Sequence, residues 1–341
     1  FAYYCKHYIG RPSPLYYAEN LSNKLGGAKI LFKQEHLNHT GSHKITNSLF
    51  QVLLAKRMGK KNLICESGAG QHYSATAAVA AKFGIPLIGV MGEVDIKRVN
   101  QNIIKAKHYG AKLKAVPGTL KEAITDAIKT WITNPDYYYV CGSAVSSFPF
   151  PKIVQFAQSI IGKEIREQCL EQEKKLPNMI IGCVGGGSNF IGSIHEFLDE
   201  PNIKKIGVEA AETAALTHGT PNIMQGMKSY MLASSDGSKS LGGSSLGAGI
   251  QYFGVGPQHS YLKDQGAVTY TSATDKEILN AYKVVAQTEG ISSALEPMAA
   301  AAEVLKQAKG KPKDFIIVLS LCGRGEKDLD TIEEHMGKDF E

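Results

Sequence analysis

The sequence predicts an α/β protein with two three-layer domains, each built on a twisted sheet of mainly parallel strands. From residue 62 onward, short β-type runs alternate with helical segments, and this is the spacing of right-handed crossovers between parallel strands. The alternation stops after a first series and starts again later in the chain. At 341 residues the chain also exceeds the size at which a single hydrophobic core stops growing. Both observations favour two α/β domains.

The first series of elements precedes residue 142. It opens with a Pro-rich turn at 11–15, a strand at 30–35 and an apolar helix at 45–58. Strands are then predicted at 62–66, 85–91, 111–116 and 137–141, and helices at 71–83, 96–108 and 120–131. Because each pair of strands is separated by a helix, the series predicts a parallel sheet.

The second series follows a long helix predicted at 153–172. Strands are predicted at 178–184, 205–208 and 315–321, and helices from residue 189, at 277–287 and at 297–309. Residues 211–258 show little periodicity, which is typical of a lid or binding loop, or of short elements without a readable pattern. We therefore place one domain at 1–155, with residues 10–42 as a candidate contribution to the other, and the second domain at 156–341.

Composition excludes several classes of protein. The net charge of +6 is spread over interleaved basic and acidic residues, so a nucleic-acid partner is not expected. No apolar stretch approaches the roughly 18 residues that a membrane span needs. The six cysteines form no metal-binding spacing, which favours a reducing compartment such as the cytoplasm. Because the chain begins with Phe1, removal of a leader and an organelle location remain an alternative.

A glycine triplet between a predicted strand and a predicted helix is the first candidate for binding chemistry. Glycines allow backbone N–H groups to approach an anion closely, and the start of a helix adds the positive end of its dipole. A phosphate suits this arrangement, whereas the alternative is a tight turn. The loop consists of Gly185, Gly186, Gly187, Ser188 and Asn189.

A second loop of the same kind follows the strand that ends at Glu66. It is sized for a carboxylate, and Glu66 beside it is a candidate proton shuttle, since burial would raise its pKa toward neutrality. The alternative is a solvated strand end. The loop consists of Ser67, Gly68, Ala69, Gly70, Gln71 and His72.

The third feature is Lys44, which opens an otherwise apolar helix. Desolvation lowers the pKa of a lysine and frees its amine to attack a carbonyl. By itself, a lysine in the first turn of a helix is more often a surface residue. An amine together with a phosphate loop and a carboxylate loop predicts pyridoxal 5′-phosphate and an amino-acid substrate.

These motifs resemble those of the tryptophan synthase beta chain family. The resemblance rests on eight segments that occur in the family's order and span nearly the whole chain. They are 10–15, 37–45, 66–72, 148–151, 184–189, 254–258, 289–296 and 321–328. It implies the second fold type of pyridoxal-phosphate enzymes, with the active site between the domains.

The resemblance also implies roles for residues of this chain. Lys44 matches the Schiff-base lysine and Glu66 the catalytic acid/base, while residues 67–72 match the loop that binds the substrate carboxylate. The cofactor-binding positions are His43, Lys44, Gly185, Gly186, Gly187, Ser188, Asn189, Glu296 and Cys322. Arg98 and Gln251 fall at positions associated with closure of the site. A monovalent cation, Na⁺ or K⁺, is expected on the backbone of Ile250, Tyr252 and Gly254.

The implied reaction condenses L-serine and indole to L-tryptophan and water through an aminoacrylate, in a lyase of amino-acid biosynthesis. The resemblance further implies a homodimer and, as a partner, a tryptophan synthase alpha subunit in an allosteric complex. Two alternatives stay open. One is another nucleophile, or deamination of serine, on the same cofactor; the other is a catalytically weakened paralogue that modulates a partner subunit.

The sequence departs from the family's pattern at several positions, and three of them in particular motivate these alternatives. Cys322 stands where the family has a serine that donates to the pyridine nitrogen, and a thiol is the weaker donor. Tyr73 replaces a glycine beside the carboxylate loop. Gln251 replaces the aspartate that pairs, on closure, with the arginine matching Arg98. Residues 211–226 look shortened, and Ser146-Ser147 replaces a Gly-Pro pair, which affects the expected lid and alpha-subunit surface. Lys44, Glu66 and the phosphate loop are intact.

Overall fold

The computed structural model describes residues 1–97, 100–234, 241 and 243–339. These residues form two compact units, of which the first comprises Phe1–Pro12 and Asn38–Ser143 and the second Ser13–Leu37 and Ala144–Glu341. Both units are α/β with mainly parallel sheets, so the predicted fold class is confirmed. The division falls after residue 143, whereas the sequence placed it after residue 155.

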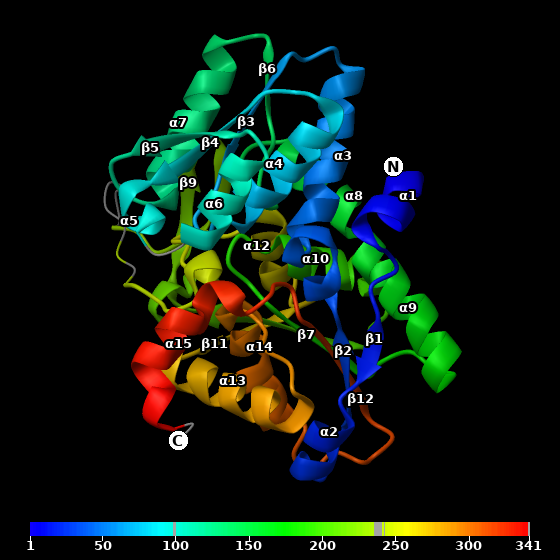
Figure 1. Cartoon of the computed structure of the whole chain (residues 1–341). Helices are drawn as coiled ribbons and strands as arrows, with labels where there is room; N and C mark the ends of the chain where they lie inside the picture. The colour runs from blue at the N-terminus through cyan, green and yellow to red at the C-terminus, as the bar shows by residue number, and fades with distance from the viewer. Residues whose placement is uncertain (98–99, 235–240, 242, 340–341) are drawn as a thin grey trace. The chain divides into compact units, whose positions relative to one another are not determined.

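The first unit is built on a parallel sheet with the strand order β5-β4-β3-β6. The longest helices described in this unit are α3, α4, α6 and α7 (Figure 1). The elements are α1 (Ala2–Tyr4), α3 (Lys44–Arg57), β3 (Asn62–Glu66), α4 (Gln71–Phe83), β4 (Leu87–Gly92), α5 (Glu93–Ile96), α6 (Asn100–His108), β5 (Lys112–Val116), α7 (Leu120–Thr133) and β6 (Tyr137–Tyr139).

The direction of the chain reverses once in this sheet. From β3 it moves outward through α4 to β4 and through α6 to β5, and α7 then carries it back to β6 on the other side of β3. Right-handed crossovers therefore place α4 and α6 on one face and α7 on the other, and Figure 1 shows α4 and α7 on opposite sides of the strands. In such sheets ligands bind at the carboxyl ends of the strands where the order reverses. That point lies at the ends of β3 and β6.

Tyr73, the bulky departure from the family's pattern, is accommodated by a glycine. Its side chain is fully buried, and it lies on α4 over β4. A Cβ on Gly89 would lie only 2.2 Å from the tyrosine ring, so no larger residue fits opposite it. The ring therefore occupies the space that the missing side chain of Gly89 leaves.

The second unit has a six-stranded sheet in the order β1-β2-β12-β7-β8-β11 and a separate two-stranded sheet of β9 and β10. Only β1 is antiparallel in the larger sheet. The elements are β1 (Leu15–Tyr17), α2 (Glu19–Leu25), β2 (Lys29–Lys33), α8 (Phe150–Gln158), α9 (Ile160–Glu173), β7 (Met179–Cys183), α10 (Ser188–Ile194), β8 (Lys204–Ala210), α11 (Ala215–His218), β9 (Thr220–Met224), β10 (Met227–Met231), α12 (Pro257–Asp264), β11 (Thr269–Ala273), α13 (Asp275–Glu289), α14 (Leu295–Gln307), β12 (Ile316–Ser320) and α15 (Leu329–Met336).

This sheet reverses in the same way as the first. The chain moves outward from β7 to β8 and β11, and α13 and α14 then return it to β12 on the other side of β7. The Ala-rich helix α14 packs closely on the sheet, and its residues join the buried core of the unit. The reversal point lies at the ends of β7 and β12.

Two predicted elements differ from those observed. The helix predicted at 153–172 is two helices, α8 and α9, divided at Ser159, whose hydroxyl donates to the Gln155 carbonyl. Within 211–258 the chain forms α11 and the hairpin β9–β10, whose turn places Gln225 and Gly226 at φ 50° and 77°. Two successive positive φ angles are typical of a type I′ hairpin turn. The part of this segment that the structure describes therefore contains short elements.

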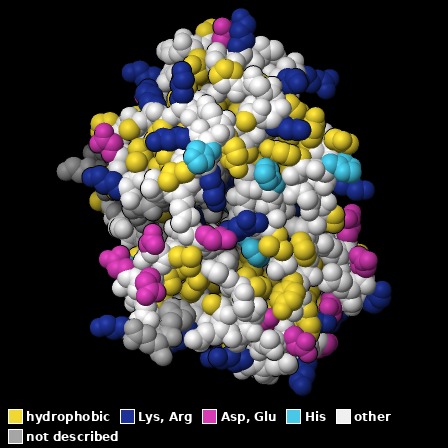
Figure 2. Space-filling view, viewed as in Figure 1, with side chains coloured by type: hydrophobic (Ala, Val, Ile, Leu, Met, Phe, Trp, Pro, Cys, Tyr) yellow, Lys and Arg dark blue, Asp and Glu magenta, His cyan; other side chains and the backbone are white. Residues whose placement is uncertain are grey.

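The surface carries charged side chains of both signs, as the interleaved basic and acidic residues of the sequence predict. On the face shown in Figure 2, basic and acidic side chains both occur, separated by uncharged ones. No helix among the described residues is long and apolar enough to cross a membrane. All six cysteines are buried, and none is joined to another by a disulfide bond.

The contact between Tyr73 and Gly89 makes a prediction about stability. The substitution Gly89→Ala should lower the free energy of unfolding by about 1–3 kcal/mol, because the new methyl group overlaps the buried ring. Urea unfolding followed by circular dichroism would measure this loss.

Replacing the ring with a smaller side chain provides the control. In a Tyr73→Leu background, Gly89→Ala should cost clearly less, which gives a coupling energy between the two positions. Equal costs in both backgrounds would contradict the assignment of Tyr73 to this space.

Candidate active site

Glu66 and Gly142 meet at the reversal point of the first sheet. Glu66 is the last residue of β3, and Gly142 follows the end of β6, the neighbouring strand. The Gly142 N–H donates a hydrogen bond of 2.7 Å to Glu66 Oε1. The backbone thus fixes one oxygen of a carboxylate that is only 3% exposed.

The amine of Lys44 binds Gly142 at its carbonyl oxygen. Lys44 is the first residue of α3, and its Nζ donates to the Gly142 carbonyl at 2.5 Å. Two further side chains of α3, Asn47 and Gln51, each donate to the Cys141 carbonyl at 2.8 Å. The helix that carries the amine is therefore attached directly to the end of β6, and the Gly142 peptide groups hold both the amine and the carboxylate.

Position 142 has no room for a side chain. A Cβ there would lie 2.7 Å from both Glu66 Oε1 and the His72 ring. The His72 ring is held from the other side, because its Nε2 lies 2.8 Å from the Val140 carbonyl and its Nδ1 lies 3.4 Å from the hydroxyls of Ser48 and Thr76. The contact with the Val140 carbonyl requires a proton on Nε2 of His72.

Burial sets the charge of these groups. Desolvation raises the pKa of Glu66 to about 7, although Tyr139, the Gly142 N–H and Lys44 partly oppose it. Desolvation, with a smaller effect of Lys44, lowers the pKa of His72 to about 3. His72 is therefore a neutral packing group near pH 7, while Glu66 can hold or release a proton there.

The loop expected to bind a carboxylate lies between β3 and α4. Its backbone is fixed at both ends, since Ser67 N–H donates to the Val90 carbonyl and Asn102 Nδ2 donates to the Ala69 carbonyl. Gly70 has a φ of 72° and leads into α4, whose first N–H groups have no partner within the helix. Because the His72 ring faces Val140, only the backbone of His72 is available to an anion at this loop. Asn102 was not predicted from the sequence.

The glycine loop of the second unit follows β7 and precedes α10. Gly185 packs on backbone, because a Cβ would lie 2.7 Å from the Gly249 carbonyl oxygen. Gly187 has a φ of 93°, and a Cβ there would lie 2.2 Å from the ring of His259. Close packing therefore requires both glycines, and the positive φ also favours glycine at position 187.

His259 holds this loop through a chain of hydrogen bonds. Its Nε2 lies 2.8 Å from the Gly187 carbonyl and its Nδ1 2.8 Å from the Tyr270 hydroxyl, and its ring stacks on Phe190 of α10. Burial lowers the pKa of His259 to about 4, so the ring is neutral near pH 7 and donates from Nε2. The sequence did not single out His259, which lies 72 residues from Gly187.

Cys322, expected near the cofactor ring, lies beside a second thiol. Its Sγ is 3.6 Å from Cys183 Sγ at the end of β7. Asn189 of the glycine loop donates from Nδ2 to the Cys183 carbonyl at 3.0 Å. The glycine loop and the segment after β12 therefore meet at these two cysteines.

Glu296 takes part in a buried ion cluster that the sequence did not reveal. Its Oε1 lies 2.9 Å from Lys327 Nζ and accepts a 2.7 Å hydrogen bond from Gly249 N–H. The same Lys327 lies 2.6 Å from Asp328, whose other oxygen accepts from Leu295 N–H. Desolvation raises the pKa of Glu296, but Lys327 outweighs it and the net shift is downward. Glu296 is thus an ionised anchor for the segment around Gly249.

The residues expected at closure and at a cation site are only partly described. Arg98 lies outside the described residues, and Gln251 follows a short helical turn, Ala248–Ile250. The Ile250 carbonyl accepts hydrogen bonds from Thr213 Oγ1 and Tyr252 N–H. No cluster of three or more His, Cys, Asp or Glu side chains suited to a metal occurs among the residues described.

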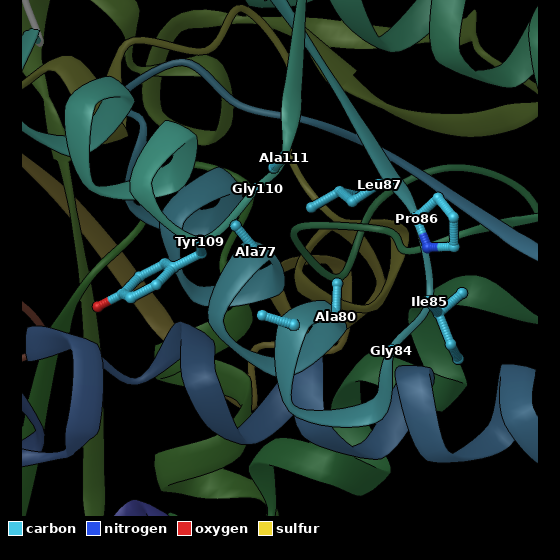
Figure 3. A pocket seen from close by; sticks show the side chains of 10 residues that line it. Ala77, Ala80, Gly84, Ile85, Pro86, Leu87, Tyr109, Gly110 and Ala111 are labelled. Carbon is cyan, nitrogen blue, oxygen red and sulfur yellow. The ribbon is translucent and has the colours of Figure 1, made fainter.

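A small hollow in the first unit is unrelated to these groups. It has a volume of about 170 Å³ and lies between the end of α4 and the turn after α6, with Tyr109 at one side (Figure 3). Ile85, Pro86 and Leu87 place it at the amino end of β4. Ligands of open α/β sheets bind at the opposite, carboxyl ends, which is where Glu66 lies.

Comparison with known proteins identifies the class of enzyme. A family model described as "Pyridoxal-phosphate dependent enzyme" matches residues 7–323. A tryptophan synthase beta chain from Allorhizobium ampelinum is 50% identical over 343 aligned positions, covering 97% of this chain and 84% of that protein. This chain belongs to the pyridoxal-phosphate dependent enzymes and, among them, to the tryptophan synthase beta chain family.

The fold has a counterpart among solved structures. The crystal structure of a fungal L-serine ammonia-lyase from Rhizomucor miehei matches with a TM-score of 0.75, covering 96% of this chain and 98% of that one. Its sequence identity is 18%, so the likeness concerns the fold alone.

The residues present suit pyridoxal phosphate. Gly185 and Gly187 leave a loop without side chains where backbone N–H groups can approach a phosphate. Asn189 Oδ1 is buried and has no hydrogen-bond partner among the described residues, which leaves it available to a bound group. Lys44 supplies the primary amine that this cofactor requires.

The raised pKa of Glu66 predicts a pH-dependent stability. Folding favours the protonated form, so stability from this group is present below pH 4.5 and is lost as the pH rises toward about 7. Relative to Glu66→Gln, which cannot titrate, the wild type should lose up to about 3 kcal/mol of unfolding free energy over this range. Urea unfolding of both proteins at several pH values would measure the difference, and parallel pH curves would contradict it.

The contact between His259 and Gly187 predicts an effect on cofactor affinity. His259→Phe keeps the stacking on Phe190 but leaves the Gly187 carbonyl and the Tyr270 hydroxyl without partners, so pyridoxal phosphate should bind roughly tenfold more weakly. His259→Gln, which can still donate, should recover part of the affinity. Titration of the cofactor by absorbance measures this, with His335→Phe, at an exposed position of α15, as the control. Wild-type affinity in the Phe variant would refute the assignment.

Proposed function

We propose that this chain uses pyridoxal phosphate to replace the hydroxyl of L-serine with indole, giving L-tryptophan and water. The observation that carries the proposal is the pairing of Lys44 and Glu66 on the Gly142 peptide groups, because the reaction needs an amine and an acid at a fixed distance. The 50% identity to a tryptophan synthase beta chain supports the choice of substrates.

In this proposal Lys44 both holds the cofactor and moves the α-proton of serine. Pyridoxal phosphate, when bound, supplies an electron sink for the negative charge that develops at the α-carbon. The Gly142 carbonyl accepts from Lys44 Nζ and so holds the amine on the residue whose N–H binds Glu66. Such an acceptor keeps a lysine amine oriented when it is not otherwise engaged.

Glu66 acts as the acid that assists departure of the serine hydroxyl. A group that both gives and takes a proton works best with a pKa near the working pH, and the pKa of Glu66 is raised to about 7. Gly142 N–H binds Oε1, so the orientation of the carboxyl is set before substrate arrives. After the hydroxyl leaves, the same carboxylate can accept the proton that indole releases.

The two backbone loops would bind the anionic ends of the reactants. We assign the serine carboxylate to residues 67–72, which Asn102 anchors, and the cofactor phosphate to residues 185–189, which His259 anchors. Exclusion of water from these loops would protect the reactive substrate from hydrolysis. The homodimer, the alpha-subunit partner and the monovalent cation stay predictions of the resemblance.

Substrate turnover tests the proposal. Purified protein loaded with pyridoxal phosphate is mixed with L-serine, with and without indole, and tryptophan and pyruvate are measured. We expect tryptophan when both substrates are present and little pyruvate from serine alone. Lys44→Ala should abolish turnover, whereas Lys56→Ala, an exposed lysine on the same helix, should leave it unchanged.

The same assay separates the alternatives. Pyruvate as the main product with or without indole would establish deamination instead. Activity only with a thiol or another aromatic compound would change the nucleophile. Turnover that persists in Lys44→Ala, or is absent from the wild type, would contradict the catalytic assignment.

A further inference from the structure

Two thiols meet where the strand order of the second sheet reverses. Cys183 is the last residue of β7, and Cys322 follows the end of β12. Their sulfur atoms are 3.6 Å apart, and the residues are 1% and 4% exposed. The family pattern has a serine at position 322, so this pairing of thiols is a feature of the present chain.

The backbone around these cysteines suits a disulfide. Strands β7 and β12 are parallel neighbours, with Ile181 opposite Leu319, two residues before Cys183 and three before Cys322. A disulfide bond is about 2.05 Å long. The two sulfur atoms, now 3.6 Å apart, need to approach by only about 1.5 Å, which rotation of the two side chains can supply.

We propose that Cys183 and Cys322 form a modification site, at which a peroxide-type oxidant converts the two thiols to a disulfide. One thiol attacks the peroxide, its sulfur is oxidised to a sulfenic acid, the O–O bond breaks and one water leaves. The second thiol attacks that sulfur, the S–S bond forms and a second water leaves. Two thiols and one hydrogen peroxide thus give one disulfide and two waters, and a dithiol reductant reverses the change.

The second thiol is already in place when the first is oxidised. At 3.6 Å, Cys322 and Cys183 are close enough for the sulfenic acid to be captured before it is oxidised further. By contrast, Cys169 lies on α9 and Cys65 in β3, in other parts of the fold. The pair at 183 and 322 is thus the site at which a disulfide is expected to form.

The disulfide would alter two groups assigned to the cofactor, and this consequence rests on the proposed function. Oxidation removes the thiol hydrogen of Cys322, which the resemblance places at the pyridine nitrogen. It also moves the side chain of Cys183, whose sulfur lies 3.6 Å from Asn189 Nδ2 of the phosphate loop. We therefore expect the oxidised chain to bind pyridoxal phosphate about tenfold more weakly, as for the loss of one hydrogen bond.

Peptide mapping of the oxidised protein tests the bond itself. Cofactor-free protein is treated with hydrogen peroxide, unfolded, alkylated and digested. We expect one cross-linked peptide pair that contains Cys183 and Cys322, with the loss of two hydrogens, and its disappearance after dithiothreitol. Cys169→Ser should give the same cross-link, and Cys183→Ser and Cys322→Ser should give none. Oxygen added to either thiol without a cross-link, or a different pair, would overturn the proposal.

A second probe does not depend on the variants. Phenylarsine oxide binds two adjacent thiols at once, so untreated wild-type protein should take up one equivalent at residues 183 and 322. Uptake at another pair of cysteines, or none, would count against the site.

Cofactor titration before and after oxidation tests the consequence: unchanged affinity in a cross-linked protein would overturn the link to the cofactor. Tryptophan formation by the reduced protein is measured separately, so failure of either proposal is recognised by itself.

Discussion

The hydrogen bonds to Gly142 are the constraint on which the proposed chemistry of the first unit depends. Its N–H binds Glu66 and its carbonyl accepts from Lys44, so the backbone fixes the separation of an acid and an amine. The contact exists because the chain returns to place β6 beside β3. Residue 142 is a glycine because a side chain there would overlap both Glu66 and His72. A local contact between two strand ends thus depends on the topology of the whole sheet.

In the second unit, the residues proposed to bind the cofactor also lie where the strand order of the sheet reverses. Its sheet also reverses once, and the glycine loop and Cys322 follow the two strands at that point. His259, which comes from α12 beyond the loop in sequence, fixes the loop through Gly187 and is kept neutral by burial. In both units a buried neutral histidine packs against a glycine of the proposed site, His72 against Gly142 and His259 against Gly187. These histidines act as supports, and the groups proposed to move protons are Lys44 and Glu66.

The sequence predicted those features that depend on residues close together in the chain. Lys44 at the start of an apolar helix, Glu66 at a strand end and the glycine loop are visible as local patterns, and the structure places each on the element predicted. Gly142, Asn102, His259 and Lys327 were missed because their roles arise from long-range pairing; Gly142 is 76 residues from Glu66. The hairpin β9–β10 was missed because its turn uses Gln225, which carries no strong turn signal.

Covalent trapping shows whether the amine of Lys44 carries the cofactor. Protein loaded with pyridoxal phosphate is reduced with sodium borohydride, digested and mapped by mass spectrometry. We expect a single pyridoxyl label on the peptide that contains Lys44, the first residue of α3. A label on another lysine, or bound cofactor that borohydride does not attach to Lys44, would contradict it.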